Sequence, residues 1–492
     1  MKKVFFYSTI SLLLAFSVSC NKFLEKEPDN RAKLDTPEKV SQLLGTAYPQ
    51  ANYQPFAETM SDNVADIGNG AVDNTIRDAF FFIDTKENQQ DSPEYYWYGC
   101  YTAIAAANQA LETISKAVDP TNYSAQKGEA LVARAYAHFM VVNFFSKFYD
   151  PVTAASDPGV PYVTEPETVF IKQYERKTVQ YVYDMIEKDL LEGLPLLQDK
   201  NYTVPKYHFN RAAANAFATR FYLFKKDYNK VIQFATAAIP GNNFGPNLRQ
   251  WNTAYKNITD VTELFKIYAK GSEPANLLLV ETSSSWARNY YSNRYGLDQA
   301  KQSLLFPRPD PITGGNFAFS LYSVNSGTHA LVPKIDEYFV KVSVNANIGT
   351  PYVMVPLFTV EEVLFNQAEA YALTGNTAAA IANLNIYAST RINNYNAANN
   401  TITAAKITSV FNTANIQDAL IGAILYYKRA EFVHEGQRWF DILRYKLPVT
   451  HATSPSATGS VTVLATLTAN DPRKVLQVPQ STSLAGLAPN PR

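Results

Sequence analysis

Two segments of this chain, 212–239 and 360–388, match one another at a fixed offset of 149 residues, the separation of Tyr222 and Tyr371. No other feature of the sequence constrains the fold as strongly. Each segment has apolar residues at helical spacing, then a short turn, then a second helical run, with small residues where the two runs would touch. A helical pair of this kind cannot bury its apolar face alone, so it must stack on neighbours. We therefore expect a mainly α fold built from helical pairs.

The helix–turn–helix pattern of both segments resembles the tetratricopeptide repeat. Gly375 stands in the turn of the second segment, where a left-handed residue often closes the first helix, whereas the matching Lys226 suits that conformation less well. A third helical pair is predicted around 176–197, where one apolar stripe is formed by Val179, Val182, Ile186 and Leu190. The copies are too far apart for a tandem solenoid, so long excursions must separate them.

The longest excursion, 241–359, differs in composition from the helical segments around it. Proline, glycine, asparagine and serine recur in it and are interrupted by short apolar stretches, which predicts brief strands in a loop-rich region. Further on, the alternation from Val461 to Leu467 predicts a late hairpin or edge strand. We therefore expect a helical-pair scaffold over about 36–240 and 360–447, with the excursion between these two parts.

The amino terminus has the features of a secretory signal. Two lysines precede an apolar run, Val4 to Val18, which as a helix is too short for a hydrocarbon core of roughly 30 Å. Cys20 follows at the expected cleavage site, and the only other cysteine is Cys100. This pattern predicts a bacterial lipoprotein that loses residues 1–19 and carries acyl chains on Cys20. The alternative is an ordinary signal peptide cleaved near Ser19.

Composition and motifs argue against several classes of protein. The chain has 44 basic and 44 acidic residues without a dense cationic run, so nucleic-acid binding is not expected. It lacks a phosphate-binding loop, a glycine-rich dinucleotide turn, an HExxH motif and a CxxC pair, and its five histidines are not spaced as a zinc site. We therefore expect no metal, no cofactor and no enzymatic activity. Glycoside hydrolysis is unsupported, although it needs only two carboxylates, which any protein can supply.

The segment 428–448 interleaves opposite charges at helical spacing. Glu435, Arg438 and Asp441 follow one another in steps of three, with aromatic residues between them. Such an array could line a substrate cleft, but it could also be a buried network of paired charges. We expect the second role, with Arg438 placed between Glu435 and Asp441.

Several strings that occur in order along the chain together resemble the SusD/RagB family of cell-surface nutrient-binding lipoproteins from Bacteroidetes. They are CNKFLEKEPD, MSDN, ALVARAYAHF, VPYVTEP, EGQRWFDILRY and LQVPQ. The resemblance covers 20–492 and implies an α-rich body with four tetratricopeptide-like pairs. It also implies an outer-membrane lipoprotein that presents a glycan to a TonB-dependent β-barrel transporter. A peptide ligand in the same scaffold, or a surface glycan hydrolase, are the alternatives.

Exposed aromatic rings outside helical stripes are the candidates for sugar binding, because sugar rings stack their apolar faces on aromatic side chains. One place is Tyr96 and Trp97, beside the loop that carries Asp66 and Arg77. The other is SSSWARNYYSNRYG, 283–296, in the excursion. The ligand-binding residues that we predict are Trp286, Tyr290, Tyr291, Tyr96, Trp97 and Arg77. For Trp97 the alternative is a core anchor at the head of its helix, whereas a loop-like setting leaves Trp286 little core to fill.

Overall fold

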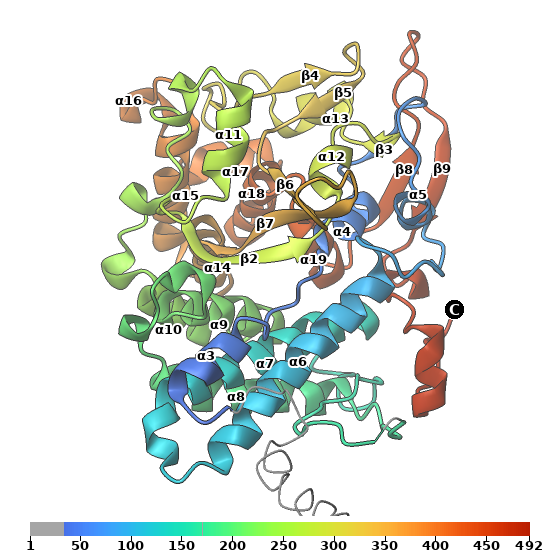
Figure 1. Ribbon diagram of the computed structural model, residues 1–492. Coiled ribbons are helices and arrows are strands. Elements are labelled where there is room, and N and C mark those ends of the chain that lie inside the picture. The colour runs from blue at the N-terminus through green and yellow to red at the C-terminus, as the bar shows by residue number, and fades with distance from the viewer. Residues whose placement is uncertain (1–33, 170) are drawn as a thin grey trace, which may run out of the picture.

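The structure is a computed structural model that describes residues 34–169 and 171–492 (Figure 1). The predicted signal segment 1–19 and Cys20 lie outside the described residues. Most of the regular structure is helical, which confirms the mainly α fold class. The longer helices are α6 (Pro93–Ser115), α7 (Ser124–Phe145), α8 (Val179–Gly193), α9 (Arg211–Lys225), α10 (Tyr228–Ala238), α14 (Val360–Leu373), α15 (Thr377–Arg391) and α18 (Ile416–Glu431). The shorter ones are α3 (Pro37–Leu44), α4 (Gln54–Met60), α5 (Asn74–Phe81), α11 (Val261–Tyr268), α12 (Trp286–Asn289), α13 (Gln299–Leu305), α16 (Ala397–Asn400), α17 (Ala404–Val410) and α19 (Gln437–Arg444).

The two repeated segments form the helical pairs α9–α10 and α14–α15, as predicted. In each turn a backbone N–H donates to a tyrosine carbonyl at the same register, Tyr222 at 2.9 Å and Tyr371 at 2.8 Å. Each turn also contains a left-handed residue, Gly375 with φ 81° and Lys226 with φ 65°. Lys226 therefore adopts the conformation that its side chain disfavours, because the turn geometry is shared by both pairs.

Helix α7 is wedged between α6 and α8 and is buried on all sides along nearly its whole length. The predicted third stripe is confirmed, since its four residues are buried on α8. The segment 176–197 does not form a helical pair of its own, however, because α8 pairs with α7. Gly128 and Gly193 permit this close contact: a Cβ added to Gly128 would lie 2.8 Å from the carbonyl oxygen of Gly193.

The charged segment 428–448 is not one continuous helix. Helix α18 ends at Glu431, and α19 begins at Gln437. Between them the chain turns through two left-handed residues, His434 with φ 74° and Gly436 with φ 71°. Helical spacing therefore cannot predict which side chains before the break lie next to which side chains after it.

The paired charges predicted for this segment exist, but their partners are different. Arg438 forms an ion pair with Asp62 at 2.9 Å, and not with Glu435, which pairs with Lys334 at 2.7 Å. Asp441 is bound by two cations, Lys428 at 2.8 Å and Arg444 at 2.9 Å. The prediction of a buried charge network is thus confirmed, while the placement of Arg438 between Glu435 and Asp441 is wrong. The helix break separates Glu435 from Arg438, and Lys428 and Arg444 pair with Asp441 instead.

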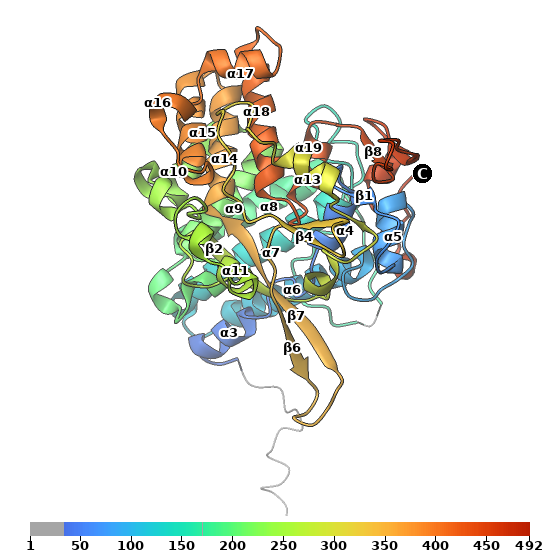
Figure 2. The same cartoon turned by 90° about the horizontal axis from the view of Figure 1, so that it is seen from above.

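The excursion contains short strands, as predicted, together with α11, α12 and α13. Its main sheet is antiparallel with the order β2–β7–β6, and Figure 2 shows the β6–β7 hairpin leaving the body of the molecule. The late strand expected from 461 to 467 is β9. The strands of the main sheet are β2 (Asn276–Ser283), β6 (Glu337–Lys341) and β7 (Gly349–Thr359). The small antiparallel pairs are β1 (Ala65–Asp66) with β3 (Tyr295–Gly296), β4 (Tyr322–Val324) with β5 (His329–Leu331), and β8 (Val449–Ala452) with β9 (Val463–Leu467).

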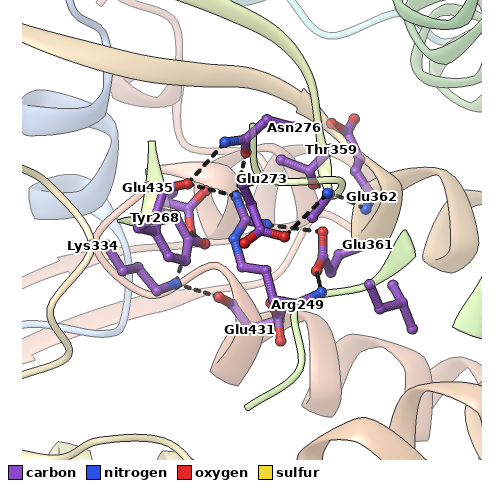
Figure 3. A network of polar contacts seen from close by, with 12 residues as sticks. Arg249, Tyr268, Glu273, Asn276, Lys334, Thr359, Glu361, Glu362, Glu431 and Glu435 are labelled. Carbon is purple, nitrogen blue, oxygen red and sulfur yellow. Dashed lines mark hydrogen bonds and ion pairs between the residues drawn. The ribbon is translucent and has the colours of Figure 1, made fainter. Parts of the chain in front are cut away.

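A buried network of ion pairs joins the excursion to the helical scaffold (Figure 3). Arg249 of the excursion contacts Glu361 at the start of α14 at 2.9 Å. Glu361 also contacts Arg391, which in turn binds Glu431 at 2.7 Å. Burial disfavours ionisation of Glu431, but the Arg391 guanidinium outweighs this effect and lowers the pKa of Glu431. Because breaking one member would leave a buried charge unpaired, the network holds the two parts of the chain in a fixed relation.

Candidate functional site

The loop beside the first predicted ligand place and the segment of the second meet at one seam, formed by loop 62–75 and segment 286–296. Strands β1 and β3 pair Ala65 with Gly296 and Asp66 with Tyr295. The pairing continues along the loop, where Ala71 donates its N–H to Ser292 at 3.0 Å and accepts from the Arg294 N–H at 2.9 Å. Segments more than 200 residues apart therefore form one continuous surface.

An ion pair fixes the centre of this seam. The Arg294 guanidinium donates two hydrogen bonds to the Asp66 carboxylate, at 2.7 and 2.8 Å. Burial opposes ionisation of Asp66, yet the hydrogen bonds from Arg294 and the Gly68 N–H lower its pKa. Asp66 is buried, while 38% of the Arg294 side chain is exposed. The pair thus presents a fixed cation at the surface.

Arg77 lies beside the same seam on α5. Its guanidinium donates to Asp78 at 2.7 and 3.0 Å and to Asn74 at 3.0 Å, which leaves 42% of the side chain exposed. One turn further along α5, Phe80 stacks on Tyr295 with ring centroids 4.5 Å apart. Helix α5 is therefore packed against β3, and Arg77 lies on the helix that borders the seam.

Tyr291 is the one partly exposed aromatic residue of the predicted set. Its ring stands edge-on to the buried Tyr290 at a centroid distance of 5.4 Å. Its carbonyl accepts a hydrogen bond from the Asn325 side chain at 3.2 Å, next to β4. A left-handed turn at Asn325 and Ser326 thus brings a third segment, 322–329, to the rim of the seam.

Trp286 and Tyr290 lie beneath the seam and not on it, with only 3% and 2% of their surfaces exposed. The Trp286 indole donates its N–H to the carbonyl of His434 at 3.1 Å, and Tyr290 packs edge-on against the His434 ring. The expectation of a loop-like setting for Trp286 is wrong, because this residue starts α12 and fills the core beside the chain break before α19. In this structure neither ring offers a face to a ligand.

Tyr96 and Trp97 are also buried, within the first helical layer. Tyr96 packs against Phe56 and Phe144, and Trp97 packs edge-on against Phe145 at 4.9 Å. This is the core-anchor arrangement that the sequence left open for Trp97. The structure does not bring these two rings to the seam with Arg77 and Tyr291.

A cleft of about 430 Å³ opens on another face of α5, between the start of α6 and the carboxy-terminal segment 473–489. Apolar side chains line it together with the polar residues Asp84, Lys86, Glu94, Arg473 and Gln480. Sequence reasoning missed these residues. The string LQVPQ marked this segment as part of a family pattern, but no periodicity connects it with α5.

The described residues contain no group of three or more His, Cys, Asp and Glu side chains that could hold a metal ion. Burial raises the pKa of the Cys100 thiol, so within the described part of the chain this free cysteine is a core residue. Across 34–169 and 171–492, no helix is long and apolar enough to cross a membrane.

Comparison with known families identifies the chain. A family model described as "Starch-binding associating with outer membrane" matches residues 22–223, and a model described as "SusD family" matches residues 345–475. The chain belongs to the SusD/RagB family. No curated protein matches it.

Solved structures share the SusD fold with this chain. A SusD superfamily protein from Bacteroides thetaiotaomicron VPI-5482 has a TM-score of 0.67 at 20% identity, covering 93% of this chain and 100% of that one. A putative sugar binding protein from Bacteroides vulgatus ATCC 8482 gives 0.70 at 22% identity, covering 94% and 99%. A laminarin binding SusD-like protein gives 0.58 at 17% identity, covering 93% and 99%. At these identities the likeness concerns the fold.

Proposed function

We propose that this SusD/RagB protein binds an oligosaccharide or polysaccharide at the cell surface and delivers it to a TonB-dependent transporter without cleaving it. The observation that carries the proposal is the match of residues 22–223 to a family model described as starch-binding and associated with the outer membrane. The relatives described as sugar binding and laminarin binding support a glycan over a peptide. In this proposal Cys20 carries the lipid anchor.

The seam is the ligand-binding surface in this proposal. Tyr291 offers a partly exposed ring for an apolar sugar face, and the guanidinium groups of Arg77 and Arg294 offer fixed donors for hydroxyl oxygens. Trp286 and Tyr290 act as positioning residues under Tyr291. Tyr96 and Trp97 contribute as core residues, and Tyr96 packs against Phe56 of α4, the helix beside α5. Of the predicted residues, Tyr291 and Arg77 thus contact the ligand in this proposal, and the four buried rings support them.

A titration of the mature protein with a panel of oligosaccharides and peptides tests the proposal. Calorimetry should show binding to at least one glycan and to no peptide, and chromatography of the same mixtures should show the glycan intact. Binding confined to peptides would establish the alternative ligand class. Shortened glycan products that scale with protein concentration would establish hydrolysis.

A further inference from the structure

The β6–β7 hairpin extends from the molecule as a regular two-stranded ribbon (Figure 2). Its register pairs Tyr338 with Tyr352 and Val340 with Thr350. Beyond the strands the Val342 N–H still donates to the Ile348 carbonyl at 3.1 Å. The ribbon therefore keeps its pairing almost to its tip.

One face of this ribbon is apolar and lies in solvent. Side chains alternate between the two faces of a strand, so Tyr338, Val340 and their partners on β7 share a face. The tip continues the apolar pattern, with Val342 69%, Val344 91% and Ile348 70% exposed. Large aliphatic side chains gathered at one exposed tip indicate a surface that contacts something apolar.

The hairpin contains very few charged residues. From 338 to 360 the sequence contains one charged residue, Lys341. The acidic groups at the base are already engaged: Glu337 accepts from Arg288 at 2.6 Å, and Glu281 accepts from the Tyr338 hydroxyl. The tip therefore carries a cation and no anion.

We propose that this hairpin contacts the membrane, with its aliphatic tip placed among the headgroups and upper acyl chains of a phospholipid bilayer. The order of residues from tip to base fits this position. Val342, Val344 and Ile348 surround the turn at the tip, which also carries Ser343, Asn345 and Asn347 with polar groups for headgroups. Lys341 can extend its ammonium back toward water, and the stacked pair Tyr338 and Tyr352, 5.8 Å apart, lies nearer the body. This arrangement suits shallow contact at the level of the headgroups and upper acyl chains.

A protein partner would be recognised differently. Protein–protein contacts are dominated by Trp, Tyr and Arg in desolvated pockets, and valine and lysine are poor contributors to them. The tip, 342–348, contains no aromatic residue and no arginine, and the exposed Phe339 with Arg288 over its ring lies nearer the base of the hairpin. Its composition therefore favours lipid as the occupant.

The start of the described chain lies toward the same side as the hairpin. In Figure 2, α3 faces the side on which the hairpin projects. Thirteen residues separate Cys20 from Leu34, and a fully extended segment of this length reaches at most about 45 Å. A lipid anchor at Cys20 would thus keep the hairpin within reach of the bilayer. This step uses the anchor in the proposed function, but the inference is independent of the glycan.

Vesicle binding by the unlipidated protein tests the inference separately from the anchor. The mature chain with Cys20→Ala should co-sediment with vesicles of phosphatidylethanolamine and phosphatidylglycerol. Replacing Val342, Val344 and Ile348 by serine should lower its partition coefficient at least about tenfold, because three inserted aliphatic side chains are lost. A matched control replaces exposed residues elsewhere, Val118, Val152 and Ile171, by serine and should bind as the parent does.

A fluorescent reporter locates the contact. Val344→Cys in the Cys20→Ala background, labelled with an environment-sensitive dye, should show a blue-shifted emission when vesicles are added, whereas Val118→Cys should not. Cys100 is buried and should remain unlabelled. Equal shifts at both positions, or none at Val344, would overturn the inference.

Two further outcomes would also overturn it. One is that the parent protein does not bind vesicles, and the other is that the hairpin and control variants bind equally well. If the hairpin variant instead loses a co-purifying barrel protein while vesicle binding is absent throughout, the tip is a protein contact. Glycan titration of the same variants keeps the two proposals apart, because a lost membrane contact should leave glycan affinity unchanged.

Discussion

Asp62 and Arg438 are 376 positions apart in the sequence, yet their side chains form a two-point ion pair at 2.9 and 3.0 Å. Asp62 belongs to the loop that forms the seam, and Arg438 to the first turn of α19. Arg429 also approaches Asp62, at 3.4 Å. The loop is thus fixed at its base by the segment that most clearly marks the family.

Removing the Arg438 side chain should destabilise the protein. Arg438→Ala should lower the free energy of unfolding by about 2–3 kcal/mol, less than for a fully buried pair because Arg429 remains near Asp62. Urea unfolding measures the change, and Arg288→Ala at the exposed Glu337 pair is the control, with an expected loss below about 1 kcal/mol.

The pair of Asp62 and Arg438 should also make stability depend on pH. Burial alone would raise the pKa of Asp62, but Arg438 and Arg429 lower it to about 2. A depressed carboxylate pKa stabilises the fold above its unfolded value of about 3.9, and this contribution is lost as pH falls toward 2. The stability difference between wild type and Asp62→Asn should therefore shrink between about pH 5 and pH 2, and a constant difference would contradict the pairing.

The left-handed lysine in the first turn gives a second prediction. Lys226→Gly should raise the free energy of unfolding by about 0.5–1 kcal/mol, because glycine adopts φ 65° without a Cβ clash. Gly375→Ala, at the matching position, should lower it by a similar amount. Thermal unfolding of both variants measures these changes. If both substitutions changed the free energy of unfolding in the same direction, turn strain would not be the cause.

Trp286 should behave as a core residue. Trp286→Ala should destabilise the protein by about 3–5 kcal/mol. Trp286→Phe keeps most of the ring but leaves the His434 carbonyl without its donor, so a loss of about 1 kcal/mol is expected. Denaturant unfolding distinguishes the two variants. If Trp286→Ala left stability unchanged and weakened glycan binding, Trp286 would instead contact the ligand directly.

Tyr291 should affect the ligand without affecting the fold. Once a glycan is identified, Tyr291→Ala should weaken its binding about 3- to 10-fold, the effect of losing one stacked ring. Tyr181→Ala, an exposed tyrosine on α8, is the matched control and should bind as wild type does. If both variants bind equally well, the cleft beside α5 becomes the next surface to test, with Arg473→Ala.

Cys20→Ala should move the protein from the membrane fraction to the soluble fraction when it is expressed in its native host. The acyl chains contribute adhesion and no core contacts, so the melting temperature should not change. Fractionation followed by immunoblotting measures the distribution. Full retention in the membrane fraction would contradict lipidation at this residue.

The sequence predicted features that depend on local spacing. The α9–α10 and α14–α15 pairs follow from apolar periodicity, and even the strained Lys226 turn repeats the register of Gly375. The partner of Arg438 and the burial of Trp286 depend on contacts 376 and 148 residues away, which no local pattern records. The seam depends on two-residue strands, β1 and β3, too short to give an alternation signal. Exposure of aromatic residues was therefore the least predictable property.

The ion-pair network in Figure 3 limits how this molecule can be re-engineered. Arg249 and Lys334 come from the excursion, while Glu361, Glu431 and Glu435 come from the flanking helical segments. If the excursion were replaced by one without matching cations, the carboxylates of the helical segments would be left buried and unpaired. Chimeras should therefore fold only when the cations and the carboxylates of this network are transferred together.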